Sequence, residues 1–234
     1  MPFLRWLKAP YRYLRSQWES SQNRKRYGSA EDYNAEQYWT DRHSDFGFDL
    51  RGVGNKGLTQ EENEAQYREG KATFLQLLSE EKISLEGKNV LDVGCGIGFY
   101  AGILQEQKVA SYRGLDITNA LFPKLEERFP GFVFNQVDVS TAEIEGEHDV
   151  VIMIDVTQHI TNEDKFAFAM QNLKRVVKKG GQIVLTSWLS EQESHSFYER
   201  SRTLAAYQEQ FSGWNFGKPR SFRDKFIFVV SRPA

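Results

Sequence analysis

The stretch that decides the fold reads VLDVGCGIGF and spans residues 90–99. An apolar run that contains Asp92 leads directly into glycines at every second position, Gly94, Gly96 and Gly98. Glycines between a strand and a helix let the backbone approach a ligand closely and aim the amides of the helix N-terminus at it. The stretch therefore predicts the first strand-to-helix turn of an open α/β sheet, with a ligand bound beside it.

Carboxylates near this turn indicate the chemistry of that ligand. A dinucleotide turn reads G-x-G-x-x-G and holds a pyrophosphate, whereas here Asp92 stands two residues before the first glycine and would repel one. Asp116 and Asp138 end the next two β-branched runs, where they could accept hydrogen bonds from ribose hydroxyls and from an adenine amino group. The pattern predicts a nucleoside that carries a cation instead of phosphates.

The rest of the chain alternates between strand-like and helix-like segments. Strands are expected over 89–94, 112–117, 132–139, 149–155, 182–188 and, in antiparallel pairing, 225–231. Helices are expected from the capping box Thr59–Glu62 to about Leu78, over 162–178, and over 190–211. For the second helix we expect Thr161 with Asp164 as the N-terminal cap and Gly180-Gly181 as the end. Apolar strands alternating with helices predict a parallel sheet covered on both faces.

Five segments in this order resemble the class I S-adenosylmethionine-dependent methyltransferases: VLDVGCGIGFYAGIL, GLDIT, QVDVS, DVVIMIDVTQHI and LKRVVKKGGQIVLTSW. The resemblance covers roughly residues 70–190 and, more loosely, the final strand. It implies an α/β, Rossmann-like, seven-stranded and mostly parallel sheet with helices on both faces and the last strand antiparallel. It also implies an enzyme with S-adenosylmethionine as cofactor.

The same resemblance assigns roles to residues at the strand ends. It places Asp92, Gly94, Cys95, Gly96 and Gly98 around the methionine part and the ribose, Asp116 and Ile117 at the ribose and adenine, Asp138 and Val139 at the adenine rim, and Asp155 beneath the cofactor. Many members have Glu where Asp116 stands, and both side chains hold a diol. Cys95 is interpreted as a packing residue, not as a nucleophile.

Methyl transfer from a sulfonium is an in-line displacement that needs a positioned acceptor and, for an alcohol or ammonium, a base. His159 lies just past the fourth strand and is the candidate base, with a structural role in the loop as an equal alternative. Candidates for acceptor contacts are Tyr38, Trp39, His43 and His195, while Arg42, Arg51 and Lys56 either meet an anionic acceptor or form a solvated loop. No metal is expected, because the sequence has no H-E-x-x-H or paired-Cys pattern.

The front of the chain differs from the remainder. Residues 1–28 carry seven Lys or Arg against one Glu, a balance of 7 − 1 = +6, which leaves −2 − 6 = −8 for the remaining residues. On a helical wheel Phe3, Leu4, Leu7, Tyr11, Leu14 and Trp18 form one stripe beside basic residues. We expect an N-terminal cap over 1–58 and a cofactor-binding domain over 59–234. The stripe is interpreted as a lid, with peripheral membrane contact through residues 3–18 as the alternative.

The predicted function is methyl transfer from S-adenosylmethionine to a small-molecule or glycan-like acceptor, with oxygen favoured over the nitrogen of an amine. A nucleic-acid methyltransferase is disfavoured by the acidic remainder and by DVTQ at 155–158, where an Asn/Asp-Pro-Pro-aromatic motif would stand. A non-catalytic cofactor-binding module is the further alternative. With one cysteine and no long apolar run, the expected compartment is the cytoplasm.

Overall fold

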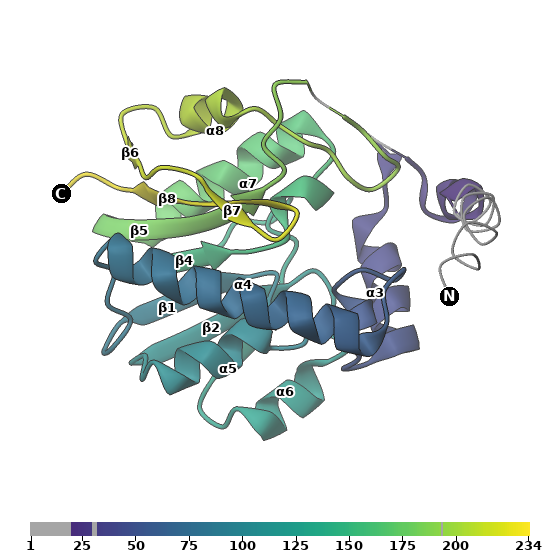
Figure 1. Ribbon diagram of the computed structural model, residues 1–234, viewed down its shortest axis with the longest axis horizontal. Helices are drawn as coiled ribbons and strands as arrows, with labels where there is room; N and C mark the ends of the chain where they lie inside the picture. The colour runs from purple at the N-terminus through teal and green to yellow at the C-terminus, as the bar shows by residue number, and fades with distance from the viewer. Residues whose placement is uncertain (1–19, 30–31, 193) are drawn as a thin grey trace, which may run out of the picture.

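A computed structural model of the chain describes residues 20–29, 32–192 and 194–234, and these form a twisted sheet between two layers of helices (Figure 1). The strands are β1 (Asn89–Val93), β2 (Ser111–Asp116), β3 (Val133–Gln136), β4 (His148–Met153), β5 (Val177–Ser187), β6 (Asn215–Phe216), β7 (Arg220–Phe222) and β8 (Lys225–Ser231). Their order is β3-β2-β1-β4-β5-β8-β6, with β7 also paired to β8.

The sheet confirms the Rossmann-like prediction. Strands β1 to β5 pair in parallel, and β8 runs antiparallel to β5. The sheet has eight strands where seven were expected. The difference arises at residues 215–222, where two short strands both pair with β8 in antiparallel fashion.

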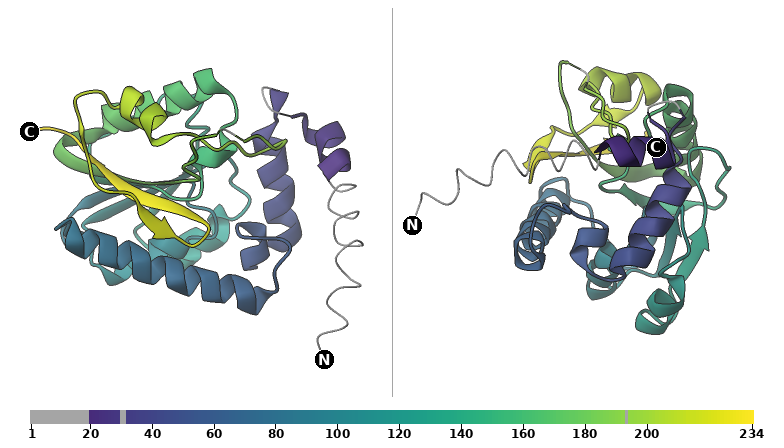
Figure 2. Two further views of the ribbon diagram at one scale, coloured as in Figure 1. Left: turned by 45° about the horizontal axis from the view of Figure 1, so that its top comes forward. Right: turned by 90° about the vertical axis from the view of Figure 1, so that its right-hand side faces the viewer.

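Two apolar clusters cover the two faces of the sheet. On one face α4 (Gln60–Glu80), α5 (Phe99–Glu106) and α6 (Phe122–Arg128) pack on side chains such as Val90 and Val150. On the other, α7 (Glu163–Val176) and α8 (Leu204–Gln210) pack on Leu91 and Val151. Neighbouring strand residues thus serve opposite faces, as the pleat requires. Figure 2 shows α4 and the α7–α8 pair on opposite sides of the sheet.

The predicted start of α4 is confirmed and that of α7 is wrong. Thr59 Oγ1 accepts from the Glu62 amide at 3.2 Å while the Glu62 carboxylate accepts from the Thr59 amide at 2.8 Å. At α7 the cap is Asn162, whose side chain accepts from the Lys165 amide at 3.0 Å. This helix ends at Val176, before the glycines, because Val177 already pairs with His148 in the sheet.

The helix expected over 190–211 forms only from Leu204, capped by Thr203. The described residues between 188 and 203 instead fold back on themselves through bridges from Leu189 to Arg202 and from His195 to Arg200. Arg202 in this segment makes buried contacts with the loop after β4, and these outweigh the helical period of the sequence. We call residues 188–203 the return loop.

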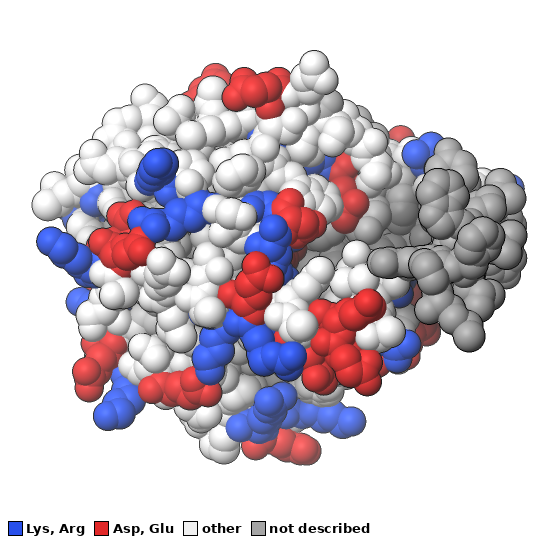
Figure 3. All heavy atoms as spheres, viewed as in Figure 1, with Lys and Arg blue, Asp and Glu red and all other residues white. Residues whose placement is uncertain are grey.

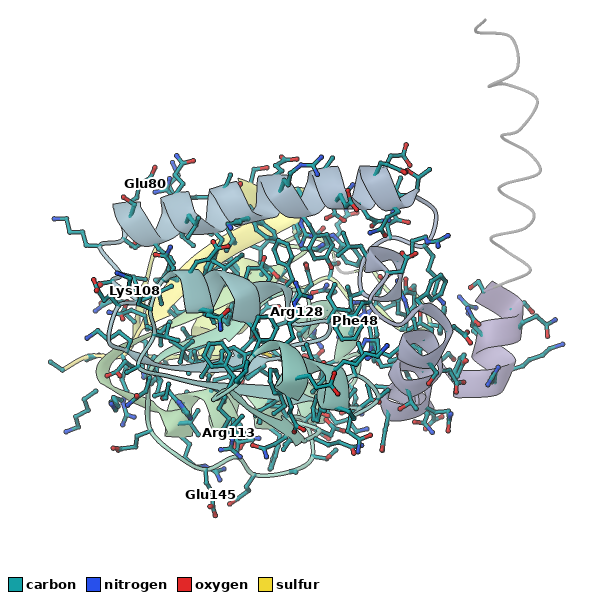
Figure 4. The ribbon with its side chains drawn as sticks, turned by 90° about the horizontal axis from the view of Figure 1, so that it is seen from below. Phe48, Glu80, Lys108, Arg113, Arg128 and Glu145 are labelled. Carbon is teal, nitrogen blue, oxygen red and sulfur yellow. The ribbon has the colours of Figure 1, made fainter. Side chains whose placement is uncertain are left out.

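Two further elements, α3 (Ala35–Phe46) and η2 (Leu50–Gly52), lie across the carboxyl ends of the strands. The helix α3 stands at the right of Figure 1, and η2 follows it. We call α3 with η2 the roof. In Figure 4, Glu80 and Lys108 lie toward the end of the molecule opposite α3, where the parallel strands begin.

The N-terminal predictions have different outcomes. The stripe at residues 3–18 lies outside the described residues, and the boundary at residue 58 stays a prediction. Within residues 20–29, 32–192 and 194–234, no helix combines the length and apolar character that a bilayer crossing needs. The compartment stays a prediction.

Candidate functional site

A cavity of about 470 Å³ lies between the roof and the carboxyl ends of β1, β2 and β4. This volume is typical of small-molecule sites. Of the sequence-predicted residues, the cavity is lined by Gly94, Cys95, Gly96, Asp116, Ile117, Asp138, Val139, Asp155, Trp39, His43 and His159. Asp92, Gly98, Tyr38 and His195 are not part of its lining.

The glycines of the turn are required by backbone conformation and by packing. Gly94, Gly96 and Gly98 have φ of +80°, +52° and +75°, which favours glycine at all three positions. A Cβ at Gly98 would lie 2.6 Å from Leu125 and 2.9 Å from Phe129, both on the α6 side. Gly98 lies outside the cavity lining, and its lack of a side chain makes room for α6, so its place around the ligand stays a prediction.

Asp116 and Asp138 are fixed at the cavity wall by backbone amides. Asp116 accepts from the amides of Gly96 at 2.9 Å and Thr118 at 3.2 Å. Asp138 Oδ1 accepts from the amide and the hydroxyl of Ser140, at 2.9 and 2.6 Å. Carboxylate oxygens have several lone pairs, so both groups can accept further hydrogen bonds from a ligand.

Asp92 lies behind the wall and not in it. It follows Val90 by two residues on β1 and so shares its face of the sheet, where its carboxylate accepts from the Tyr112 hydroxyl at 2.8 Å. Burial raises the pKa of Asp92 to about 7, and the charge of Asp116 adds to the effect while Tyr112 opposes it. The side chain that the sequence placed at the cationic end of the ligand therefore packs beneath the turn.

Cys95 has the environment of a packing residue. The side chain is buried, and its amide donates to the Leu115 carbonyl at 2.9 Å. Burial raises the pKa of the thiol well above its usual value, so the reactive thiolate is disfavoured.

Asp155 is joined to two cations from the β7–β8 hairpin. Its carboxylate pairs with Arg223 and, at 3.1 Å, with Lys225. Burial alone would raise the pKa of Asp155, but the two cations outweigh it and bring the pKa down to about 2. The backbone of Asp155 is left-handed, with φ of +62°, so this position is strained and held by its surroundings.

In the part of the chain that the structure describes, no three His, Cys, Asp or Glu side chains are grouped so that they could hold a metal ion.

His159, on η3 (Thr157–His159), is held as part of the wall. Its Nδ1 lies 3.1 Å from the Tyr198 carbonyl oxygen, so Nδ1 carries the proton, and its Nε2 lies 3.4 Å from the Gln158 side-chain nitrogen. The ring stacks on Tyr198 and meets Trp39 edge-on, with centroids 5.4 and 5.0 Å apart. Burial lowers the pKa of His159 to about 4, so the imidazole is neutral at pH 7 and is a weak base.

Two predicted acceptor residues lie elsewhere. Tyr38 belongs to a buried aromatic cluster, which we call the lid cluster, made of Tyr27, Tyr33, Tyr38 and Phe197 with Trp39 and Tyr198 against it. His195 is an exposed residue of the return loop. Sequence reasoning missed Tyr33, which lines the cavity, although the density of aromatic residues around it was a usable signal.

The basic residues of the roof and of the loop after it contact groups of the same segment. Arg42 is buried and donates to the carbonyls of Arg51, at 2.9 Å, and Gly54, while Arg51 pairs with Asp49. The Lys56 ammonium lies over the Tyr38 ring, 5.4 Å from its centroid. Arg42 is thus held by the loop that follows α3, while Arg51 lies exposed beside Asp49, and contact of either with an anionic acceptor stays a prediction.

Arg202 is a further residue that sequence reasoning missed. Its side chain is fully buried and donates to the carbonyls of Thr157, at 3.2 Å, and Ile160, at 2.6 Å, and it pairs with Glu163 at 2.7 Å. It thereby holds the loop after β4 that carries Asp155 and His159. A helix was expected here, and the serine-rich run at 190–196 was the available signal for a loop.

The chain is similar in sequence to known methyltransferases. A family model described as a methyltransferase domain matches residues 61–232. The tRNA (carboxymethyluridine(34)-5-O)-methyltransferase of Arabidopsis thaliana is 31% identical over 166 residues, covering 69% of this chain and 38% of that protein. The ubiquinone biosynthesis O-methyltransferase of Pseudomonas paraeruginosa is 32% identical over 117 residues, covering 46% of this chain and 47% of that protein. The chain thus spans less than half the length of these relatives.

Solved structures share the fold. The complex of DhpI with SAH superposes with a TM-score of 0.64 at 15% identity, covering 85% of this chain and 95% of that one. The magnesium protoporphyrin IX methyltransferase of Synechocystis with bound SAH gives a TM-score of 0.63 at 17% identity, covering 84% and 99%.

Proposed function

The chain belongs to the class I S-adenosylmethionine-dependent methyltransferases, and on that premise we propose that it methylates an oxygen atom of a small-molecule acceptor. Its enzyme class and its methyl donor, S-adenosylmethionine, follow from the family. The acceptor and the roles of individual residues are our proposal.

The cavity residues fit the methyl donor. In our proposal Asp116 accepts from the ribose hydroxyls and Asp138 from the adenine amino group, since both carboxylates line the cavity with lone pairs to spare. Ile117 and Val139, beside them, would pack on the adenine ring, and Gly94, Cys95 and Gly96 would border the methionine part. Asp155, already paired with two cations, would lie at the floor.

S-adenosylmethionine supplies a methyl group on a sulfonium, and this chain's part is to position the acceptor and exclude water. Trp39 and His159 form a ring-lined wall that suits this task. We assign His159 to that wall and not to proton removal, because a carbonyl, and no carboxylate, supports its Nδ1. An acceptor oxygen that ionises readily, as in a carboxylic acid or an acidic phenol, needs no strong base.

The observation that carries the small-molecule proposal is the cavity itself, which has the volume of a small-molecule site and is lined by Trp39 and His43 of the roof and by Tyr33. The face drawn in Figure 3 intersperses Lys and Arg with Asp and Glu, where a phosphate backbone would favour a basic stripe. Oxygen as the acceptor atom is supported by the names of both groups of curated relatives.

A tRNA acceptor is the second candidate, favoured by the 31% identity over 69% of the chain with the tRNA methyltransferase of Arabidopsis thaliana. A base could reach this cavity only after flipping out of its stack.

Methyl transfer from radiolabelled S-adenosylmethionine to separate pools of carboxylic acids, phenols, amines and bulk tRNA tests the proposal. We expect label in the acid or phenol pool, and mild alkali will release it from a methyl ester but not from an ether. Label confined to tRNA or to amines would overturn the small-molecule oxygen proposal. An Asp116→Ala variant serves as the control for transfer that depends on this cavity.

A further inference from the structure

One cavity-lining residue of the roof has a buried polar atom that no group in the described part of the chain satisfies. His43 is 3% exposed and lines the cavity. Among the described residues, its Nε2 has no hydrogen-bond partner. Buried side-chain polar atoms are nearly always hydrogen-bonded, so an orphan on a cavity wall indicates a partner that the cavity receives.

The position of His43 on α3 identifies the part of the cavity that it faces. Trp39 lies one turn earlier on the same face of the helix, and the two ring centroids are 5.9 Å apart. Trp39 contacts His159 at one end of the cavity. His43 instead lies where the charge of Asp116 acts on its imidazole.

The residue that follows the roof lies close to the glycine turn. A Cβ built on Gly96 would lie 3.1 Å from Cγ1 of Val53, the residue that follows η2, and the Gly96 amide donates to Asp116. Asp116 accepts from backbone amides and not from His43. The imidazole and the carboxylate therefore border the same space from the roof and from the sheet, without bonding to each other.

The chemistry of the two groups limits what fits in that space. Burial and the neighbouring Arg42 lower the pKa of His43, against the opposing charge of Asp116, so the ring is neutral at pH 7. A neutral imidazole nitrogen donates or accepts according to its tautomer, whereas a carboxylate only accepts. When Nε2 carries the proton, a hydroxyl oxygen accepts from it and gives its own single proton to Asp116. When Nε2 is bare, one hydroxyl of a diol donates to it and the neighbouring hydroxyl donates to Asp116.

We propose that His43 holds a ribose hydroxyl of the bound cofactor from the roof, opposite Asp116. The cofactor is then bound between α3 and the sheet, and not by the strand ends alone. This inference rests on the proposed assignment of Asp116 to the ribose. It moves His43 from the acceptor role that the sequence predicted to a cofactor role.

Calorimetric titration of the full chain with S-adenosylhomocysteine tests the inference without depending on turnover. His43→Phe keeps a planar ring but removes both nitrogens, and it should weaken binding about tenfold, the effect of one lost hydrogen bond. His195→Phe is the matched control, since that histidine is exposed and away from the cavity, and its affinity should equal that of the wild type.

Titration with the 2′-deoxy and 3′-deoxy forms of S-adenosylhomocysteine locates the contact. The wild type and His43→Phe should have equal affinity for the form that lacks the hydroxyl bound by His43. If His43→Phe lost the same affinity for all three ligands, or lost none for any of them, the inference would be overturned. If the wild type bound none of the three, the proposed cofactor site itself would be contradicted.

The wild type provides a second measurement if His43→Phe does not fold. The ¹⁵N signal of His43 Nε2 should shift when S-adenosylhomocysteine is added and should shift less with one deoxy form. An unchanged signal at saturating ligand would contradict the proposed contact.

Discussion

The two halves of the cavity are built in different ways. At the ends of β2 and β3, Asp116 and Asp138 are fixed by amides two residues further along, and Asp116 also by the glycine turn. After β4, the loop that carries Asp155 and His159 depends on Arg202 and Arg223, which lie tens of residues away in the chain. We call the first the local half, because it follows from local backbone geometry. We call the second the distant half, because it forms only when the return loop and the β7–β8 hairpin have docked.

The largest effect is expected at the glycine turn, where it packs against the loop after β4. Gly94→Ala places a Cβ against Val156 at a φ of +80°. It should lower the free energy of unfolding by about 2–5 kcal/mol, from overpacking and left-handed strain together. Gly131→Ala is the matched control, because its φ is +89° and nothing lies within 4 Å of the added Cβ, so only the strain remains. Equal losses for the two variants in urea unfolding would show that packing at Gly94 is unimportant.

The next effect is expected in the distant half. Arg202→Met leaves the carbonyls of Thr157 and Ile160 without their donor, and should cost about 2–4 kcal/mol of unfolding free energy, since its partner Glu163 is half exposed. Methyl transfer should fall more steeply than affinity for S-adenosylhomocysteine, because the ends of β2 and β3 are untouched. Arg175→Met, which breaks an exposed pair with Glu143, is the control. A variant that lost cofactor affinity as strongly as turnover would mean that the two halves are not separable.

The ion pairs of Asp155 give the distant half its own pH dependence. The pKa is lowered from 3.8 to about 2 in the folded protein, so the pairing contributes stability above pH 3.8 and loses it as the pH falls toward 2. The contribution is about 2 kcal/mol. The difference in unfolding free energy between the wild type and Asp155→Asn should therefore be constant near neutral pH and shrink between pH 4 and 2. A difference that did not change over this range would contradict the ion pairs.

The smallest effect is expected at the lid cluster. Tyr38→Phe keeps the ring contacts and removes the hydroxyl that accepts a hydrogen bond from Arg42 Nη1 at 3.1 Å. The loss in unfolding free energy should be about 1 kcal/mol. Calorimetry should show unchanged affinity for S-adenosylhomocysteine, because Tyr38 does not line the cavity. Weaker binding of S-adenosylhomocysteine would show that the lid cluster affects cofactor binding in the local half.

Sequence patterns predicted best what the chain does over short distances. The capping box of α4 is complete within Thr59 and Glu62, and the last strand matches residues 225–231. The contact of Asp92 with Tyr112 did not follow from the motif, because residues alternate between the faces of a strand and the motif does not say what each face packs against. A role of Asp92 at the cofactor stays a prediction. The cap of α7 was misplaced by one residue because Thr161 and Asn162 are both good capping residues.

The sequence by itself determined the sheet, the glycine turn, the carboxylates at the strand ends and the resemblance to methyltransferases, because strand periodicity, positive φ and capping act over a few residues. Only the tertiary structure decided that Trp39, His43 and His159 line the cavity while Tyr38 and His195 do not. It also decided that the return loop is no helix. Those outcomes depend on buried contacts such as that of Arg202 with the Thr157 carbonyl, and a contact between residues so far apart leaves no periodic trace in the chain.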